Sequence, residues 1–148
     1  MKLLIQRVRE AAVAVDGETI GQIGHGLLVF VGVADTDTKQ IADKLVDKMT
    51  KLRIFDDAQG KTNLAAADVQ GEFLIVSQFT LYADCKRGNR PSFIRAGAPD
   101  MAENLYKYII ARCKEHIDIV EQGEFGADMK VELVNDGPFT VILDSNEL

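Results

Sequence analysis

The residues best suited to chemistry follow an apolar run in the middle of the chain. The segment from Glu72 to Ala83 begins as a strand that is apolar on both faces and then admits the polar side chains of Ser77, Gln78 and Thr80. Ligand sites in α/β sheets favour the carboxyl ends of strands, so these groups are candidates on position alone. Alternatively, such hydroxyls only satisfy neighbouring backbone groups.

A hydroxyl nucleophile would need a base within hydrogen-bond reach, and the chain has only two histidines. His25 lies between two glycines at a loop-to-strand junction, and His116 ends a predicted helix, where the dipole favours a cation in any case. No GxSxG elbow surrounds Ser77 or Thr80. A conventional serine-hydrolase triad is therefore poorly supported.

The sequence contains no motif for binding a metal or a cofactor. Cys85, Cys113 and the two histidines are scattered singly, without the paired spacing of metal ligands, so we expect no metal. There is no Walker loop or dinucleotide fingerprint, so we expect no cofactor. Two unpaired thiols suit a reducing compartment, which predicts a cytoplasmic protein.

The net charge of −6 argues against a protein that coats nucleic acid, DNA included, because phosphate neutralisation drives such binding. Any RNA contact must be local, and the one candidate is a basic patch comprising Lys86, Arg87 and Arg90, with Arg95 close behind. A solvated loop would look the same. The start of the chain reaches Gln6 and Arg7 too soon for a signal peptide or a membrane span.

The length of 148 residues fits one domain over residues 1–148, in which hydrophobic patterning predicts strands at both ends. Asp16-Gly17 favours a tight hairpin turn, and the unbroken apolar run 26–33 indicates a central strand. The other predicted strands cover residues 3–8, 11–15, 128–135 and 139–144, the last two around a cluster of turn formers at 135–138.

Two helices are predicted between these strands. The first begins after a cap at Thr36 or Asp37, and its apolar stripe comprises Ile41, Leu45, Met49 and Leu52. The second starts near Pro99, runs to about His116 and carries Leu105, Ile109 and Cys113 on one face. This order predicts an α/β fold in which a mixed sheet packs against two helices.

Two motifs resemble the signatures of the D-aminoacyl-tRNA deacylases: Ser77 to Ala83, and Asn135-Asp136-Gly137-Pro138-Phe139-Thr140. The resemblance covers the whole chain in family order, including residues 6–8, 26–29, 53–55, 88–93 and 125–129. Small departures are Thr62 and Ala65, where Met and Ser are common, and Phe139, where the family usually has a smaller Val. We expect the larger side chain of Phe139 to alter the pocket rim or the dimer contact.

The resemblance implies a three-layer α/β/β fold with mixed, barrel-like sheets and two main helices, forming a homodimer with two active sites at the subunit interface. It places Ser77, Gln78, Phe79 and Thr80 in the pocket. It also implies that Gly137-Pro138 is a cis unit whose carbonyl oxygens enter the partner's pocket as a chiral filter. An L side chain would collide with this unit, whereas D-aminoacyl-tRNA and glycyl-tRNA, as mischarged on tRNA(Ala), would be hydrolysed.

The resemblance also bears on how the ester would be cut. Backbone amides and the Gln78 amide would hold the oxyanion, while the terminal ribose 2′-hydroxyl helps to activate water. An acyl-enzyme on Thr80 is the competing mechanism. The patch Lys86, Arg87 and Arg90 would meet phosphates of the acceptor stem. Two other functions remain open: a non-catalytic RNA-binding module that uses this patch, and a general esterase with Thr80 as nucleophile.

Overall fold

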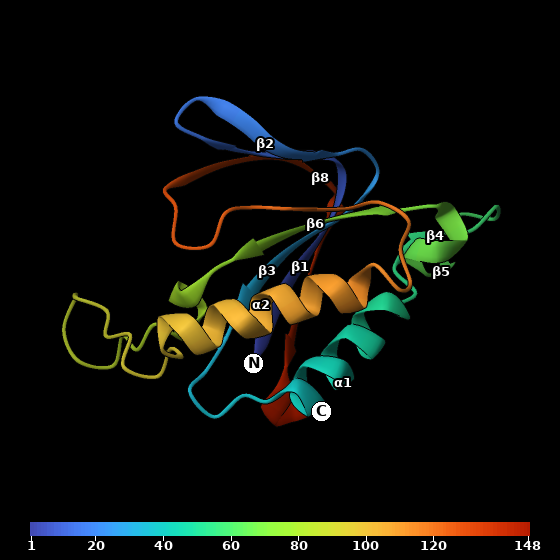
Figure 1. The fold of residues 1–148 in the computed structure, drawn as a ribbon. Coiled ribbons are helices and arrows are strands. Elements are labelled where there is room, and N and C mark those ends of the chain that lie inside the picture. The colour runs from blue at the N-terminus through green and yellow to red at the C-terminus, as the bar shows by residue number, and fades with distance from the viewer.

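The computed structural model describes residues 1–148, and one long strand, β1 (Lys2–Val15), organises the sheet. Along one edge β1 pairs antiparallel with β3 (Gly26–Gly32) and then with β2 (Glu18–Ile23); along the other it pairs with β8 (Met129–Asp144). Beyond β3, the strands β6 (Glu72–Ser77) and β7 (Val120–Gln122) continue the sheet in parallel. The result is a mixed, barrel-like sheet (Figure 1).

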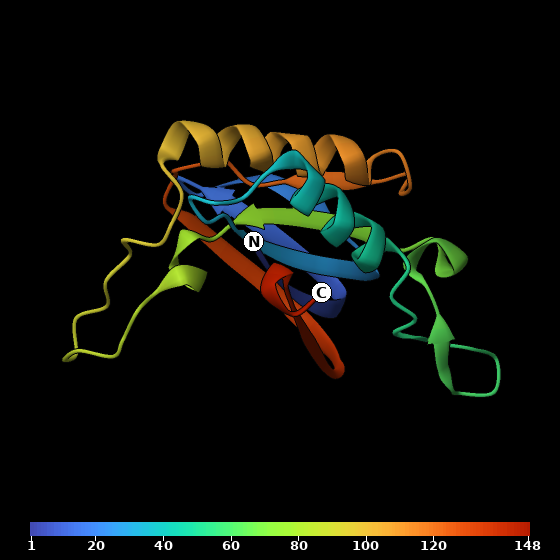
Figure 2. The same ribbon diagram turned by 90° about the horizontal axis from the view of Figure 1, so that it is seen from below.

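Two helices, α1 (Lys39–Thr50) and α2 (Pro99–Cys113), cover one face of this sheet (Figure 2). A core of 24 buried residues lies between the helices and the sheet, with Leu27 and Val29 of β3 among them. A second core of seven lies within the sheet's curve and holds Leu28 of β3 and Leu74 of β6. Because alternate residues of β3 enter different cores, the strand is apolar on both faces. The predicted α/β/β layering is confirmed.

The predicted hairpin turn is confirmed, with φ of 50° at Asp16 and 79° at Gly17 joining β1 to β2. The predicted pair of N-terminal strands is wrong, because β1 runs unbroken through Arg9 and Glu10, which stay exposed on its surface. The predicted pair of closing strands is likewise one strand, β8. In both strands, the pairing register between β1 and β8 is irregular where the sequence pattern predicted a break, and the chain remains a strand through it.

The helix boundaries differ slightly from those predicted. Thr38, rather than Thr36 or Asp37, caps α1 by accepting from the Ile41 N–H, because the Asp37 carboxylate is engaged elsewhere. Leu52 follows the helix and packs at the edge of the first core. The second helix ends at Cys113, and the residues to His116 form a turn.

Several short elements were not predicted. They are the hairpin of β4 (Phe55–Asp56) and β5 (Thr62–Leu64), strand β7, and three 3-10 helices, η1 (Ala66–Val69), η2 (Phe79–Tyr82) and η3 (Ser145–Glu147). Two to four residues are too few to show a hydrophobic period, which is why the pattern missed them. Neither helix combines the length and the hydropathy that crossing a bilayer requires.

Candidate active site

The site begins where β6 ends. Ser77 is the last residue of β6, and the Gln78 N–H still donates to the Val31 carbonyl of β3, at 2.8 Å. The chain then turns into η2, whose first hydrogen bond runs from the Leu81 N–H to the Gln78 carbonyl. All four predicted pocket residues, Ser77 to Thr80, therefore lie at this strand end.

Gly32 lets η2 lie against the end of β3. A Cβ atom on Gly32 would stand 2.9 Å from the Leu81 Cβ and 3.3 Å from the Gln78 carbonyl oxygen. The first distance is too short for two carbon atoms, so any larger residue would push η2 away. The glycine thus determines where the polar groups of η2 stand.

Hydrogen-bond donors gather at the start of η2. The Gln78 side-chain amide donates to the Thr80 Oγ1, at 2.5 Å. The first N–H groups of a 3-10 helix have no partner within the helix, and the Gln78 side chain does not cap them. Phe79 is 58% exposed and packs edge-on against Phe93, 5.0 Å between ring centroids. Phe79 and Thr80 are both exposed, so the start of η2 lies at the surface beside an aromatic pair.

Neither histidine reaches the hydroxyls of this site. His25 packs edge-on against Phe55, with 5.1 Å between ring centroids, and His116 lines a separate cavity beside Asp118. Ser77 and Thr80 thus have no histidine base within their own chain.

A cavity of about 530 Å³ opens beside Ser77, Gln78 and Phe79. Its walls are mostly apolar and come from β3, β6, η2, the start of α2 and the segment 125–131. The lining residues that sequence reasoning did not predict are Val31, Val33, Val76, Ala96, Gly97, Pro99, Ala102, Tyr106, Phe125, Gly126, Ala127, Asp128, Met129 and Val131. The motif at residues 125–129 is the one feature of the sequence that could have indicated part of this wall, but no role was predicted for it.

Tyr106 braces the floor of the cavity. Its hydroxyl donates to the Ile75 carbonyl of β6, at 2.7 Å, and thereby ties α2 to the sheet. Burial raises the pKa of Tyr106 to about 12, so the phenol stays neutral and keeps donating at physiological pH. Tyr106 is a fixed wall of the cavity rather than an acid or base.

A buried ion pair supports another part of the wall. The Met1 amino group lies 2.6 Å from the Asp37 carboxylate, which also accepts from the Ala34 N–H at 2.7 Å. Ala34 forms a backbone bridge with Ala96, and the Gly97 N–H donates to the Val33 carbonyl. The position of Ala96 and Gly97 in the wall therefore depends on Asp37.

The predicted basic patch lies on a loop that follows η2. Two hydrogen bonds between Asp84 and Ser92 close the base of the loop, and Lys86, Arg87 and Arg90 are exposed within it. None of these three cations forms an ion pair within the chain. The loop projects beyond the body of the molecule beside η2 (Figure 2). The patch therefore follows the pocket residues along the chain, on a loop that extends outward (Figure 2).

Gly137 and Pro138 lie elsewhere. The register of β8 on β1 pairs Gln6 with Thr140 and Val8 with Asn135, so residues 136–139 stand opposite Arg7 alone. The Gly137–Pro138 peptide bond is cis, and both residues are exposed. Neither lines the cavity of its own chain. The structure does not bring this motif together with Ser77 to Thr80 within one chain.

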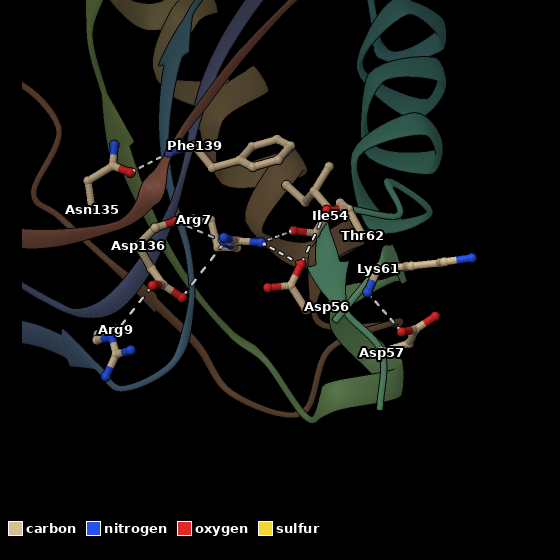
Figure 3. A network of polar contacts seen from close by, with 10 residues as sticks. All are labelled: Arg7, Arg9, Ile54, Asp56, Asp57, Lys61, Thr62, Asn135, Asp136 and Phe139. Carbon is tan, nitrogen blue, oxygen red and sulfur yellow. Dashed lines mark hydrogen bonds and ion pairs between the residues drawn. The ribbon is translucent and has the colours of Figure 1, made fainter. Parts of the chain in front are cut away.

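Arg7 braces this excursion of β8 (Figure 3). Its Nε donates to the Asp136 carbonyl at 2.9 Å and its Nη1 to the Ile54 carbonyl at 2.7 Å. The carboxylates of Asp56 and Asp136 lie 3.6 and 3.8 Å from the guanidinium, and the Phe139 ring lies against it. Sequence reasoning assigned Arg7 no role, although a cation among buried strand residues is a signal.

A family model described as D-Tyr-tRNA(Tyr) deacylase matches residues 4–144. A D-aminoacyl-tRNA deacylase of Thermosipho africanus (strain TCF52B) is 51% identical over 148 residues, which cover 100% of this chain and 99% of the relative. A protein of the same name from Lactobacillus delbrueckii subsp. bulgaricus is 55% identical over 144 residues, with 97% and 99% covered.

Two solved structures share the fold. One, titled c-Myc DNA Unwinding Element Binding Protein, superposes with a TM-score of 0.92 at 38% identity and covers 97% of this chain and 98% of its own. The other, titled as a probable eukaryotic D-amino acid tRNA deacylase, has a TM-score of 0.82 at 17% identity, with 96% and 97% covered, which bears on the fold alone. The family model and the sequence relatives span nearly the whole chain, so the chain belongs to the D-Tyr-tRNA(Tyr) deacylase family.

Proposed function

We propose that this protein hydrolyses the ester that joins a D-amino acid to the 3′ end of tRNA, releasing the free D-amino acid and tRNA. The observation that carries the proposal is the junction at the end of β6, where the donors of Gln78 and η2 border an apolar cavity of about 530 Å³. An aminoacylated tRNA end needs both features, because it combines a flat base with an ester carbonyl.

Catalysis at this junction rests on donors rather than on a side-chain base. The backbone N–H groups at the start of η2 and the Gln78 amide are suited to stabilise the negative charge that develops on the ester oxygen. With no histidine in reach, the ribose 2′-hydroxyl next to the ester is the group best placed to help activate water. The protein then orients the ester and the RNA supplies the proton transfer.

Thr80 is the alternative nucleophile. Its Oγ1 accepts a hydrogen bond from the Gln78 amide, and neither histidine lies near enough to take its proton. A hydroxyl without a base is a poor nucleophile, which disfavours the general esterase. We assign Thr80 a supporting role beside the cavity, as the hydrogen-bond partner of Gln78.

Stereoselectivity is assigned to Gly137 and Pro138 acting from a second copy. Both are exposed and lie away from the cavity of their own chain. The outer face of β8 carries exposed Val134 and Ile142, and the strand's second edge is unpaired, which favours a homodimer through this region. Sedimentation velocity measures the assembly directly.

The filter works by exclusion. A backbone segment that occupies the space of an L side chain rejects it without any contact to the D side chain, so many D-aminoacyl-tRNAs would be substrates. Glycine has no side chain to reject, so glycyl-tRNA is expected to be hydrolysed too.

The exposed cations Lys86, Arg87 and Arg90 would contact phosphates of the acceptor stem, since their loop adjoins η2. A non-catalytic RNA-binding module would use the same patch but would leave the ester intact. One solved structure of this fold is titled c-Myc DNA Unwinding Element Binding Protein, but the net charge of −6 favours a local RNA contact over duplex binding. Aminoacyl-tRNA is made in the cytoplasm, where we expect the protein to act.

The test is parallel deacylation of D-tyrosyl-tRNA and L-tyrosyl-tRNA by the wild type and by Thr80→Ala. We expect both proteins to clear only the D ester, with rates within about tenfold of each other, because a dispensable hydroxyl contributes no more than one hydrogen bond. Circular dichroism of Thr80→Ala confirms folding.

The contrary outcomes separate the alternatives. Loss of activity in folded Thr80→Ala, with an acyl-enzyme trapped on the wild type, would support the esterase mechanism. Binding of tRNA without cleavage by the wild type would support the RNA-binding module.

A further inference from the structure

Arg7 is a buried cation that forms ion pairs with Asp56 and Asp136, at 3.6 and 3.8 Å, but donates no hydrogen bond to either carboxylate. Its side chain is 8% exposed, and its two direct hydrogen bonds go to carbonyl oxygens of Asp136 and Ile54. A buried guanidinium needs further stabilisation, because desolvation of a charge is costly. The Phe139 ring provides it, with its centroid 5.0 Å from the Arg7 Cζ.

The position of Gly137 and Pro138 depends on this cation. Four residues of β8 stand opposite Arg7 alone, so the regular ladder is interrupted between Asn135 and Thr140. Three side-chain hydrogen bonds hold the excursion instead. The Arg7 Nε donates to the Asp136 carbonyl, the Phe139 N–H donates to the Asn135 Oδ1 at 2.7 Å, and the Asn135 Nδ2 donates to the Thr140 Oγ1 at 3.0 Å. Movement of the guanidinium would therefore move the segment between them.

Arg7 is held from three directions (Figure 3). Asp136 lies at its Nε, the Ile54 carbonyl and the Asp56 carboxylate lie at its Nη1, and the Phe139 ring lies against the guanidinium.

We infer that Phe139 and Asp56 clamp the Arg7 guanidinium, and that Phe139 is thereby a positioning residue for the Gly137–Pro138 segment and a determinant of stereoselectivity. The inference rests on the proposed function, in which that segment excludes L side chains. It adds that a side chain outside the pocket, together with the β4–β5 hairpin, controls how well the exclusion works.

The test compares kcat/KM for D-tyrosyl-tRNA and L-tyrosyl-tRNA in Phe139→Leu, Phe139→Tyr and Asp56→Asn. Leucine keeps apolar packing but removes the ring, so we expect the ratio of D to L to fall about tenfold, chiefly through faster cleavage of the L ester. Tyrosine keeps the ring and should restore the wild-type ratio. Asp56→Asn should also lower the ratio of D to L. When Phe139→Leu and Asp56→Asn are combined, the fall should be smaller than the sum of the two single effects.

Two matched controls lie away from the clamp. Phe30→Leu makes the same change at a half-buried position of β3, and Asp118→Asn removes a carboxylate that forms no ion pair. Both should keep the wild-type ratio. Thermal melts monitored by circular dichroism show that each variant is folded at the assay temperature.

A second readout is independent of activity. In the wild type, the Arg7 Nε–H proton should exchange slowly with water and should shift in NMR spectra under the ring current of Phe139. Phe139→Leu should speed this exchange and remove the shift, and Phe139→Tyr should retain both.

The outcomes separate the inference from the proposed function. An unchanged ratio of D to L in folded Phe139→Leu, or a parallel loss of both rates, would overturn the role of Phe139, whatever the NMR spectra show. Equal cleavage of the D and L esters by the wild type would instead defeat the proposed function. Even if the proposed function fails, an Arg7 Nε–H resonance that is the same in Phe139→Leu as in the wild type would overturn the contact between Phe139 and Arg7.

Discussion

At the scale of single residues, the site works with groups of low intrinsic reactivity. Gln78 and Thr80 hydrogen-bond to each other, Tyr106 is a neutral phenol held against β6, and no histidine reaches the hydroxyls. Such groups contribute to catalysis by where they stand rather than by donating electrons or protons. Residues that determine their positions, above all Gly32, should therefore matter as much as the polar residues themselves.

Gly32→Ala tests this dependence. The new Cβ would lie 2.9 Å from the Leu81 Cβ, so η2 must shift away from β3. We expect kcat for D-tyrosyl-tRNA to fall roughly tenfold to a hundredfold, as a displacement of about 1 Å in positioned groups can produce. Gly24→Ala is the matched control, since its Cβ would meet only the Glu72 carboxylate at 3.8 Å. Equal activity of both variants would show that η2 tolerates displacement.

At the scale of elements, β6, η2 and the basic loop form one continuous unit. The strand ends at Ser77, η2 presents its donors, and the loop closed by Asp84 and Ser92 carries the cations. In the proposed function, this arrangement would place phosphate contacts next to the ester. Changes in the loop alone should therefore weaken tRNA binding and leave the catalytic rate nearly unchanged.

The double charge reversal Lys86→Glu and Arg87→Glu tests the loop. Losing two phosphate contacts should weaken tRNA binding and reduce the slope of log affinity against log salt by about two. The catalytic rate at saturating tRNA should change little by comparison. Charge reversal of Lys44 and Lys48, on the exposed side of α1, alters net charge equally and serves as control. An unchanged salt slope in the loop variant would show that RNA binds elsewhere.

At the scale of the whole molecule, periodicity predicted the type of most long segments but divided β1 and β8 into two strands each. The central strand β3, both helices and the polar end of β6 followed from apolar spacing, because many residues contribute to each pattern. Asp37 was predicted as a cap, but tertiary contacts with the Met1 amino group and Ala34 engage it instead. The family resemblance, rather than the spacing of residues, pointed to Gly137 and Pro138.

Features formed by distant segments could not be predicted. The cavity joins β3, β6, α2 and residues 125–131, and the Arg7 network joins β1, β4 and β8. No local pattern encodes such meetings, since each residue in them would suit an ordinary strand or loop. The sequence therefore indicated the polar half of the site and missed its apolar wall and its brace.

The measurement that tests the central claim most directly is deacylation of three esters on one tRNA(Ala): D-alanyl, glycyl and L-alanyl. These substrates differ only at the α-carbon. The D-alanyl and L-alanyl esters carry a methyl group on opposite sides, and the glycyl ester carries none. A steric filter predicts that the wild-type protein hydrolyses the D-alanyl and glycyl esters and leaves the L-alanyl ester at its spontaneous rate. Cleavage of the L-alanyl ester at a rate comparable to the D-alanyl ester, or no enzymatic cleavage of the D-alanyl ester, would contradict it.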